Sequence, residues 1–238
     1  MTMYSFALRV ECREIVYNLL LNKKGATYVK QRDSQKELLE LAVRKYQESI
    51  YQAEDYLKSR GITIEVARLA RLGVVAEPEV GHEQFLGRLS IPYITKTGVV
   101  DLRFRSLNPA VEPKYMGMTG ADTKMYNVLD IDRAGDWIGV CEGELDTLTM
   151  SRCVGVPCVG VPGANSWKKH YTRLLADFER VFVFADGDGP GREFANSLAR
   201  ELPVTIVGFG DGEDANSAYT KYGAGFIKEK MGLNDGTI

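Results

Sequence analysis

Zinc ligands are scarce in this sequence. It has four cysteines and two histidines, and no two cysteines form a CxxC pair. Zinc ribbons need four Cys or His ligands at short, paired spacings, so this pattern excludes such a site. Scattered cysteines are typical of a reducing compartment, and we expect free thiols. The cysteines are Cys12, Cys141, Cys153 and Cys158, and the histidines are His82 and His170.

Long apolar runs and a general excess of basic charge are also missing. The N-terminal 25 residues are interrupted by charges from Arg9 to Glu14, which excludes both a signal peptide and a membrane span. We therefore expect a cytoplasmic protein without a membrane partner. The net charge is −2, so the chain as a whole is not a basic nucleic-acid binder. Any contact with a polyanion must come from a local patch.

Residues 34–73 carry the apolar spacing of helices. Ser34 and Glu37 predict a capping box at the start of the first helix, and Gly61 predicts its end. A second, short helix is expected from Ile64 to Leu72. A helix–turn–helix DNA reader is one interpretation, but an ordinary packed helical pair is favoured because a bare helix pair has little specificity.

Residues 85–127 predict an antiparallel hairpin that turns at Thr97-Gly98. Strand alternation places Val100, Leu102 and Phe104 on one face and Asp101, Arg103 and Arg105 on the other. The segment 88–124 contains six basic and three acidic residues, a local charge of +3 in an acidic protein. A solvated surface and a polyanion-binding surface explain this charge equally well.

From Trp137 onward, strand-like and helix-like segments alternate, which predicts a parallel sheet covered by helices on both faces. Acidic residues follow three of the strands: Glu142, then Asp186 with Asp188, then the stretch from Asp211 to Asp214. Ligands of such sheets bind at the carboxyl ends of the strands. An oxygen-only ligand set selects Mg²⁺ or Mn²⁺, and magnesium is usually completed by substrate phosphates. This pattern indicates phosphoryl or nucleotidyl transfer.

The two acidic motifs Glu142-Gly143-Glu144-Leu145-Asp146 and Asp186-Gly187-Asp188 resemble those of the Toprim domain. The order of further motifs resembles the catalytic core of bacterial DnaG-type DNA primases. These motifs are YLKSRGI ending at Ile62, GRLSIP at 87–92, DLRFRSL at 101–107, Lys114-Tyr115, and Lys124 to Asn127. The resemblance covers roughly residues 45–222 and implies a Toprim-like parallel sheet preceded by a helical and antiparallel-hairpin subdomain.

The resemblance also implies roles for individual residues. Glu142, Asp186 and Asp188 would be catalytic and would bind Mg²⁺ or Mn²⁺, with Asp146, Asp214 and Asp211 as further metal ligands. Ala215 stands where the family usually has proline, which makes the third acidic stretch the softer match. Five basic residues would hold nucleotide or template phosphates: Arg88, Arg103, Arg105, Lys114 and Lys124. The implied activity is two-metal synthesis of short RNA primers from ribonucleoside triphosphates on single-stranded DNA.

We expect three segments: an N-terminal helical segment of unknown role at 1–45, a basic primase-type N-terminal subdomain at 46–130, and a Toprim catalytic domain at 131–238. DnaG-type primases usually carry a zinc ribbon and a helicase-binding domain in addition. We find neither here, as in a compact phage-type version, and expect a separate zinc-ribbon or helicase protein as a partner. Two alternatives stay open: a Toprim-type metal-dependent nuclease, and a non-catalytic recombination-mediator or single-strand-binding module.

Overall fold

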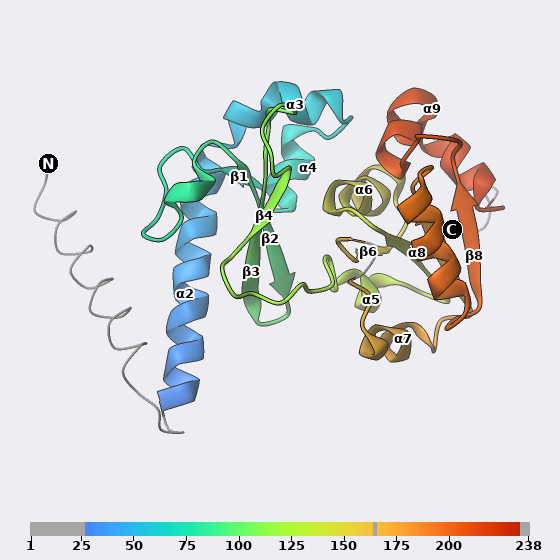
Figure 1. The fold of residues 1–238 in the computed structure, drawn as a ribbon, viewed down its shortest axis with the longest axis horizontal. Helices are drawn as coiled ribbons and strands as arrows, with labels where there is room; N and C mark the ends of the chain where they lie inside the picture. Colours follow the sequence, from blue (N-terminus) through green and yellow to red (C-terminus); the bar gives the residue numbers. More distant parts are fainter. Residues whose placement is uncertain (1–26, 164–165, 234–238) are drawn as a thin grey trace, which may run out of the picture.

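The computed structural model describes residues 27–163 and 166–233, and it contains two four-stranded sheets. The first sheet is antiparallel with strand order β1-β2-β3-β4, and the second is parallel with order β6-β5-β7-β8. The sheets belong to an N-terminal half (27–129) and a C-terminal half (130–233) that lie side by side (Figure 1). The predicted fold class is confirmed.

The N-terminal half consists of short helices around the antiparallel sheet. Its strands are β1 (Gly73–Val74), β2 (Leu89–Thr95), β3 (Gly98–Arg105) and β4 (Tyr115–Gly117). Its helices are α2 (Thr27–Glu48), the 3-10 helix η1 (Ile50–Ala53), α3 (Glu54–Ser59), α4 (Ile64–Leu69) and the 3-10 helix η2 (Glu83–Phe85). The predicted hairpin is confirmed, because β2 and β3 pair antiparallel up to Thr95 and Gly98.

The predicted helix boundaries need three corrections. The first helix does not continue to Gly61, because α2 ends at Glu48 and is followed by the separate helices η1 and α3. Ser34 lies inside α2 and does not start it, because the helix already begins at Thr27. The second helix ends at Leu69, because Arg71 adopts a positive φ of 57° and Gly73 already belongs to β1. The expected division at residue 45 falls within α2, whose buried Val43 and Tyr46 pack on the sheet. Residues 1–26 of the expected first segment lie outside the described residues.

The alternation predicted along β3 holds except at one residue. Arg103 and Arg105 pair with Ile91 and Leu89 of β2, so they share the face that looks away from α2. The register shifts at Ile94, which pairs with Val99 and leaves Val100 as the extra residue of a bulge. Val100 therefore packs with the Leu89–Ile91 side, and Val99 joins Leu102 and Phe104 instead.

The C-terminal half is the alternating part of the chain. Its strands are β5 (Trp137–Cys141), β6 (Cys158–Gly160), β7 (Arg180–Ala185) and β8 (Val204–Gly208). Its helices are α5 (Asp130–Arg133), α6 (Glu144–Leu148), the π-helical segment η3 (Thr149–Val154), α7 (Lys169–Leu175), α8 (Gly189–Ala199) and α9 (Ala215–Lys230).

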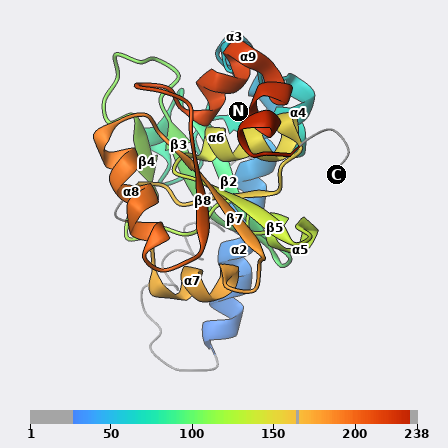
Figure 2. The same cartoon turned by 90° about the vertical axis from the view of Figure 1, so that its right-hand side faces the viewer.

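Helices cover both faces of the parallel sheet, as predicted. On one face, Leu175 of α7 and Phe194 of α8 pack against Val140 and Val183. On the other face, Met150 of η3 and Ala218 of α9 pack against the remaining strand side chains. Figure 2 shows α8 and α9 on opposite sides of β8. No helix among the described residues is long and apolar enough to cross a membrane.

The two halves share one hydrophobic core. Tyr126, Leu145 and Leu148 are buried together with Leu89 and Tyr93 of the antiparallel sheet. Tyr93 and Tyr126 meet edge-on, with ring centroids 5.2 Å apart. This apolar contact sets α6, and the acids next to it, against the basic face of β3.

The close packing of β1 on α2 makes a test of this fold. A Cβ atom on Gly73 would lie 2.3 Å from the carbonyl carbon of Tyr46, which is a backbone atom and cannot rotate away. We expect Gly73→Ala to lower the free energy of unfolding by about 1–3 kcal/mol, the usual cost of overpacking. Urea unfolding measures this loss. Gly117→Ala is the matched control, because Gly117 faces open space in β4. Equal stability of the two variants would contradict this packing.

Candidate active site

Acidic residues gather at the carboxyl edge of the parallel sheet. Glu142 directly follows β5, and Asp186 directly follows β7. These strands are parallel neighbours with Cys141 opposite Phe184, so the two acids leave the sheet at the same edge. Asp146 lies in α6, one helical turn beyond Glu142. Strand order alone therefore brings two of the predicted acidic motifs together.

The loops after β7 and β8 are hydrogen-bonded to each other. Gly187 donates its N–H to the carbonyl of Glu213 at 2.8 Å, and its own carbonyl accepts the N–H of Gly212 at 3.0 Å. A Cβ on Gly187 would lie 1.9 Å from the carbonyl oxygen of Gly210. Only glycine allows this approach, which joins the loop that carries Asp186 and Asp188 to the loop that carries Asp214.

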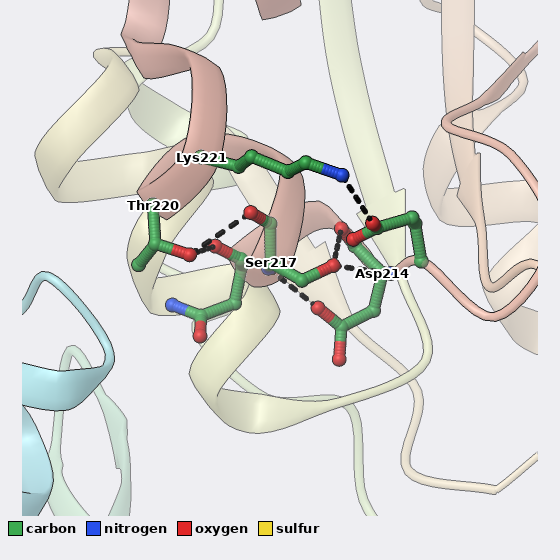
Figure 3. A network of polar contacts seen from close by, with 6 residues as sticks. Asp214, Ser217, Thr220 and Lys221 are labelled. Atoms are coloured by element: carbon green, nitrogen blue, oxygen red, sulfur yellow. Dashed lines mark hydrogen bonds and ion pairs between the residues drawn. The ribbon is translucent and has the colours of Figure 1, made fainter.

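Two of the acids also cap helices. The carboxylate of Asp188 accepts the N–H of Gly191 at 2.7 Å at the start of α8. Asp214 accepts the N–H of Ser217 at 2.6 Å at the start of α9, and the Ser217 hydroxyl accepts the N–H of Asp214 in return (Figure 3). Such caps fix the carboxylate and hold it near the positive end of the helix dipole.

The acids lie near enough to repel one another, and burial together with this repulsion raises three of their pKa values. Burial and the nearby Asp188 and Asp146 raise the pKa of Glu142 to about 7. Burial and the other four acids raise the pKa of Asp186 to about 8. Burial and Asp214 raise the pKa of Asp146 to about 6, against a lowering by the Asn216 N–H and by Arg60 and Arg105. We call Glu142, Asp146, Asp186, Asp188 and Asp214 the acid cluster.

The acid cluster fits a hydrated hard cation better than a closed metal cage. Among residues 27–163 and 166–233, no three His, Cys, Asp or Glu side chains form a group that could by itself hold a metal ion. Magnesium uses few protein carboxylates and keeps several waters, so it does not need such a group. Glu142 Oε1 is buried without a hydrogen-bond partner among these residues, and a cation or a proton would satisfy it. The described cysteines are free thiols, which leaves oxygen as the donor.

Asp211 does not join the acid cluster. Its side chain is fully exposed and lies 3.4 Å from the guanidinium of Arg192. It is also absent from the charges that raise the pKa of Asp186. The loop reverses between Gly210 and Glu213 to reach Gly187, which turns Asp211 toward solvent. Of the third acidic stretch, the structure brings only Asp214 into the cluster.

Three of the five predicted basic residues are engaged inside the N-terminal half or at its joint. Arg88 is 7% exposed and donates to the carbonyl of Pro113 at 2.8 Å. Arg103 donates to Glu144 at 2.8 Å, and Lys124 donates to Asp101 at 2.5 Å. Carboxylates neutralise Arg103 and Lys124, and Arg88 is buried against a carbonyl, so the +3 segment presents fewer free cations than its sequence indicates.

The other two basic residues line a pocket of about 470 Å³, together with Arg60 and Tyr56. Arg105 is 6% exposed, and its guanidinium lies over the rings of Tyr56 and Tyr115. Arg105 Nε and the Tyr56 hydroxyl are both buried without a hydrogen-bond partner in the described part of the chain. Lys114, the second basic residue of the pocket, forms no ion pair with any of the described residues. We call this site the basic pocket. The positive charges of Arg60, Arg105 and Lys114 along this pocket suit an anionic oxygen ligand.

Sequence comparisons place the acid cluster inside a region that is similar to a known protein family. The model of the Toprim-like family matches residues 139–219. The Gene 57 protein of Mycobacterium phage D29 is 39% identical over 153 residues, which cover 62% of this chain and 99% of that protein. This chain belongs to the same family as that phage protein. Its Toprim domain contains the whole acid cluster.

Solved structures share the fold of both halves. The RNA polymerase domain of the Mycobacterium tuberculosis primase DnaG matches with a TM-score of 0.70 and 21% identity, over 84% of this chain and 83% of that one. A DnaG primase catalytic domain bound to single-stranded DNA matches with a TM-score of 0.72 and 21% identity, over 86% and 80%. The chain therefore has the fold of the DnaG primase catalytic core.

Sequence reasoning missed three residues at the joint between the Toprim domain and the N-terminal half. Glu144, 1% exposed, accepts hydrogen bonds from Tyr93 and Arg103 at 2.8 Å each. Arg60 lines the basic pocket, and the buried Asn216 bonds to it. Arg60 and Glu144 stand inside the quoted motifs, so closer attention to YLKSRGI and EGELD would have found them. Asn216 also stands next to the third acidic stretch, two residues after Asp214, but its contact with Arg60 could not be inferred from the sequence.

The repulsion within the acid cluster predicts how stability depends on pH. The pKa of Asp186 is about 8 in the folded chain, against 3.8 for a free aspartate side chain. Its protonated form is favoured by folding, so this contribution is complete below pH 3.8 and is lost as pH rises through about 8. In the metal-free protein at pH 8, we expect Asp186→Asn to raise the free energy of unfolding on the order of 1 kcal/mol or more.

Urea unfolding in a chelator checks this prediction, with Asp211→Asn as the control for removal of an exposed charge. Added Mn²⁺ should then stabilise the wild type more than Asp186→Asn. Two results would contradict the placement of Asp186 among repelling charges. One is a lower free energy of unfolding in Asp186→Asn than in the wild type. The other is an equal increase in Asp211→Asn.

Proposed function

We propose that this chain is a DNA primase core that synthesises short RNA primers from ribonucleoside triphosphates on single-stranded DNA. The observation that carries the proposal is the meeting of the acid cluster with the basic pocket. Arg60 and Arg105 line that pocket, and both lower the pKa of Asp146 in the cluster. A triphosphate bound in the pocket would thus lie beside the acids that bind the catalytic cations.

In this proposal the acid cluster holds the divalent cations. Glu142, Asp186 and Asp188 are the catalytic ligands, and Asp146 and Asp214 complete the set. Bound Mg²⁺ or Mn²⁺ would activate the attacking 3′-hydroxyl and neutralise charge on the triphosphate and the leaving pyrophosphate. Glu142 Oε1 lacks a hydrogen-bond partner among the described residues, and in this proposal it would accept the proton of that hydroxyl.

The basic pocket provides the phosphate contacts. Arg105 is buried against two tyrosines, so its guanidinium is held in place before a ligand arrives. Lys114 contributes an exposed positive charge to the pocket. Phosphate contacts of this kind position a polynucleotide or nucleotide without reading its bases. The structural likeness to a DnaG domain bound to single-stranded DNA supports a DNA template as the partner. A separate zinc-ribbon or helicase protein remains a further expected partner.

Two other functions use parts of the same site. A Toprim-type nuclease would use the same cations to activate water. A non-catalytic single-strand-binding or recombination-mediator module would need the basic pocket alone. The pocket beside the acid cluster favours primase over nuclease, because synthesis must hold a triphosphate there. The five mutually repelling acids disfavour a binding module, which would be more stable without them.

One assay separates the three functions. The protein is incubated with single-stranded DNA, labelled ribonucleoside triphosphates and Mg²⁺ or Mn²⁺, and the products are resolved by length. We expect short RNA primers. DNA fragments would indicate the nuclease, and binding without products would indicate the module.

Asp186→Asn and Asp188→Asn should each abolish primer synthesis in the same assay. Asp188→Asn keeps the cap of α8, because asparagine is also a good N-cap residue.

Lys114 gives a clean test of the basic pocket, because its exposed side chain can be removed without disturbing the core. We expect Lys114→Ala to raise the KM for ribonucleoside triphosphates about tenfold, the loss typical of one charge-assisted contact. Template affinity should also depend less steeply on salt. Lys96→Ala is the matched control: it removes the same charge from the same segment, but Lys96 pairs with Asp132 outside the pocket. Equal effects of both substitutions would show only a loss of general positive charge.

A further inference from the structure

The side-chain amide of Asn216 joins the two halves of the molecule at the site. Asn216 is 1% exposed and lies in the first turn of α9, two residues after Asp214. Its Nδ2 donates to the carbonyl of Arg60 at 2.7 Å and to the Thr149 hydroxyl at 2.8 Å. Its Oδ1 accepts from Arg60 Nη1 at 3.3 Å. The amide therefore holds both the backbone and the guanidinium of Arg60.

The backbone of the same residue serves the acid cluster. The N–H of Asn216 donates to Asp146 Oδ1 at 3.0 Å, and this bond lowers the pKa of Asp146. One residue thus contacts the basic pocket through its side chain and the acid cluster through its main chain. A substitution of the side chain removes the first contact and leaves the second in place.

The turn that carries Arg60 depends on this contact for its position against α9. Arg60 follows the last residue of α3, and Gly61 continues the turn with a φ of +65°. A Cβ on Gly61 would lie 2.8 Å from the ring of Tyr219, so the turn rests directly on α9. In this turn, Asn216 makes the hydrogen bonds that fix Arg60 in two places.

We propose that Asn216 is a positioning residue that sets the basic pocket against the acid cluster by holding Arg60. This inference rests on the proposed function. An arginine held at both its backbone and its guanidinium is oriented before the triphosphate binds, and its contact costs less side-chain entropy on binding. Asn216 itself touches neither the phosphates nor the cations in this proposal.

The test compares Asn216→Ala with Thr149→Val. Thr149 is buried and also bonds to the Asn216 amide, but its removal leaves both contacts with Arg60 intact. We expect Asn216→Ala to raise the KM for ribonucleoside triphosphates about tenfold while kcat changes less than about threefold. The Kd for Mn²⁺ should stay within about twofold, because the N–H bond to Asp146 remains. Thr149→Val should leave all three constants near those of the wild type.

Hydrogen exchange provides a readout that does not need activity. The N–H groups of Arg60, Gly61 and Ile62 are bonded to carbonyls of α3, and we expect them to exchange at least about tenfold faster in Asn216→Ala. They should be unchanged in Thr149→Val. If Asn216→Ala does not fold, Asn216→Ser takes its place, because one hydroxyl can donate to Arg60 or to Thr149 but not to both.

The outcomes separate this inference from the proposed function. If the wild type makes no primers, the proposed primase function is refuted. The role of Asn216 is then decided by hydrogen exchange at the Arg60 N–H and by the Kd for ATP. Faster exchange with a selective rise in KM, or in the Kd for ATP, supports the proposal. Unchanged exchange overturns it. Equal effects of the Asn216 and Thr149 variants would also overturn it, and so would an equal loss of affinity for Mn²⁺ and for nucleotide. Either result would indicate that Asn216 is a purely structural residue.

Discussion

The repulsion among five carboxylates is the constraint on which this structure depends. The fold opposes it with hydrogen-bond donors that belong to the backbone. Asp188 and Asp214 each accept an N–H at the start of a helix, and Asp146 accepts the N–H of Asn216. The two loops that carry three of the acids are joined through Gly187. Backbone donors cannot rotate away, so the acids stay together even though the pKa values of Glu142, Asp146 and Asp186 show that this is unfavourable.

The positive charges that balance the acids come from the other half of the molecule. Arg60 and Arg105 lower the pKa of Asp146, and Arg60 is held by Asn216. Arg103 pairs with the buried Glu144, which lies outside the acid cluster. A buried ion pair such as Arg103–Glu144 adds little net stability, but it is costly to separate. The two halves are therefore joined at polar contacts as well as through the apolar core around Tyr93 and Leu148. The acid cluster and the basic pocket are consequently held in one arrangement.

The sequence predicted those features that depend on chain direction and periodicity. Acids at the ends of adjacent parallel strands must meet, so Glu142 and Asp186 could be placed without coordinates. Side-chain positions that depend on a single backbone reversal, or on partners far away in the sequence, could not be predicted. Asp211 turns outward in its loop, Arg88 finds a carbonyl 25 residues away, and the bulge at Val100 moves one side chain to the other face. Asn216 acquires its role only because Arg60, 156 positions earlier, folds against it.

That long separation between Arg60 and Asn216 has a consequence for how the chain folds. Contacts between residues far apart in sequence form late, because a large loop must close before they give any stabilisation. The apolar cores on each face of the parallel sheet can form without them. A folding intermediate with a formed sheet and an open joint would hold the acids without the arginines. The joint between the acid cluster and the basic pocket would then be the last part of the molecule to form, and the first to open when the protein is destabilised.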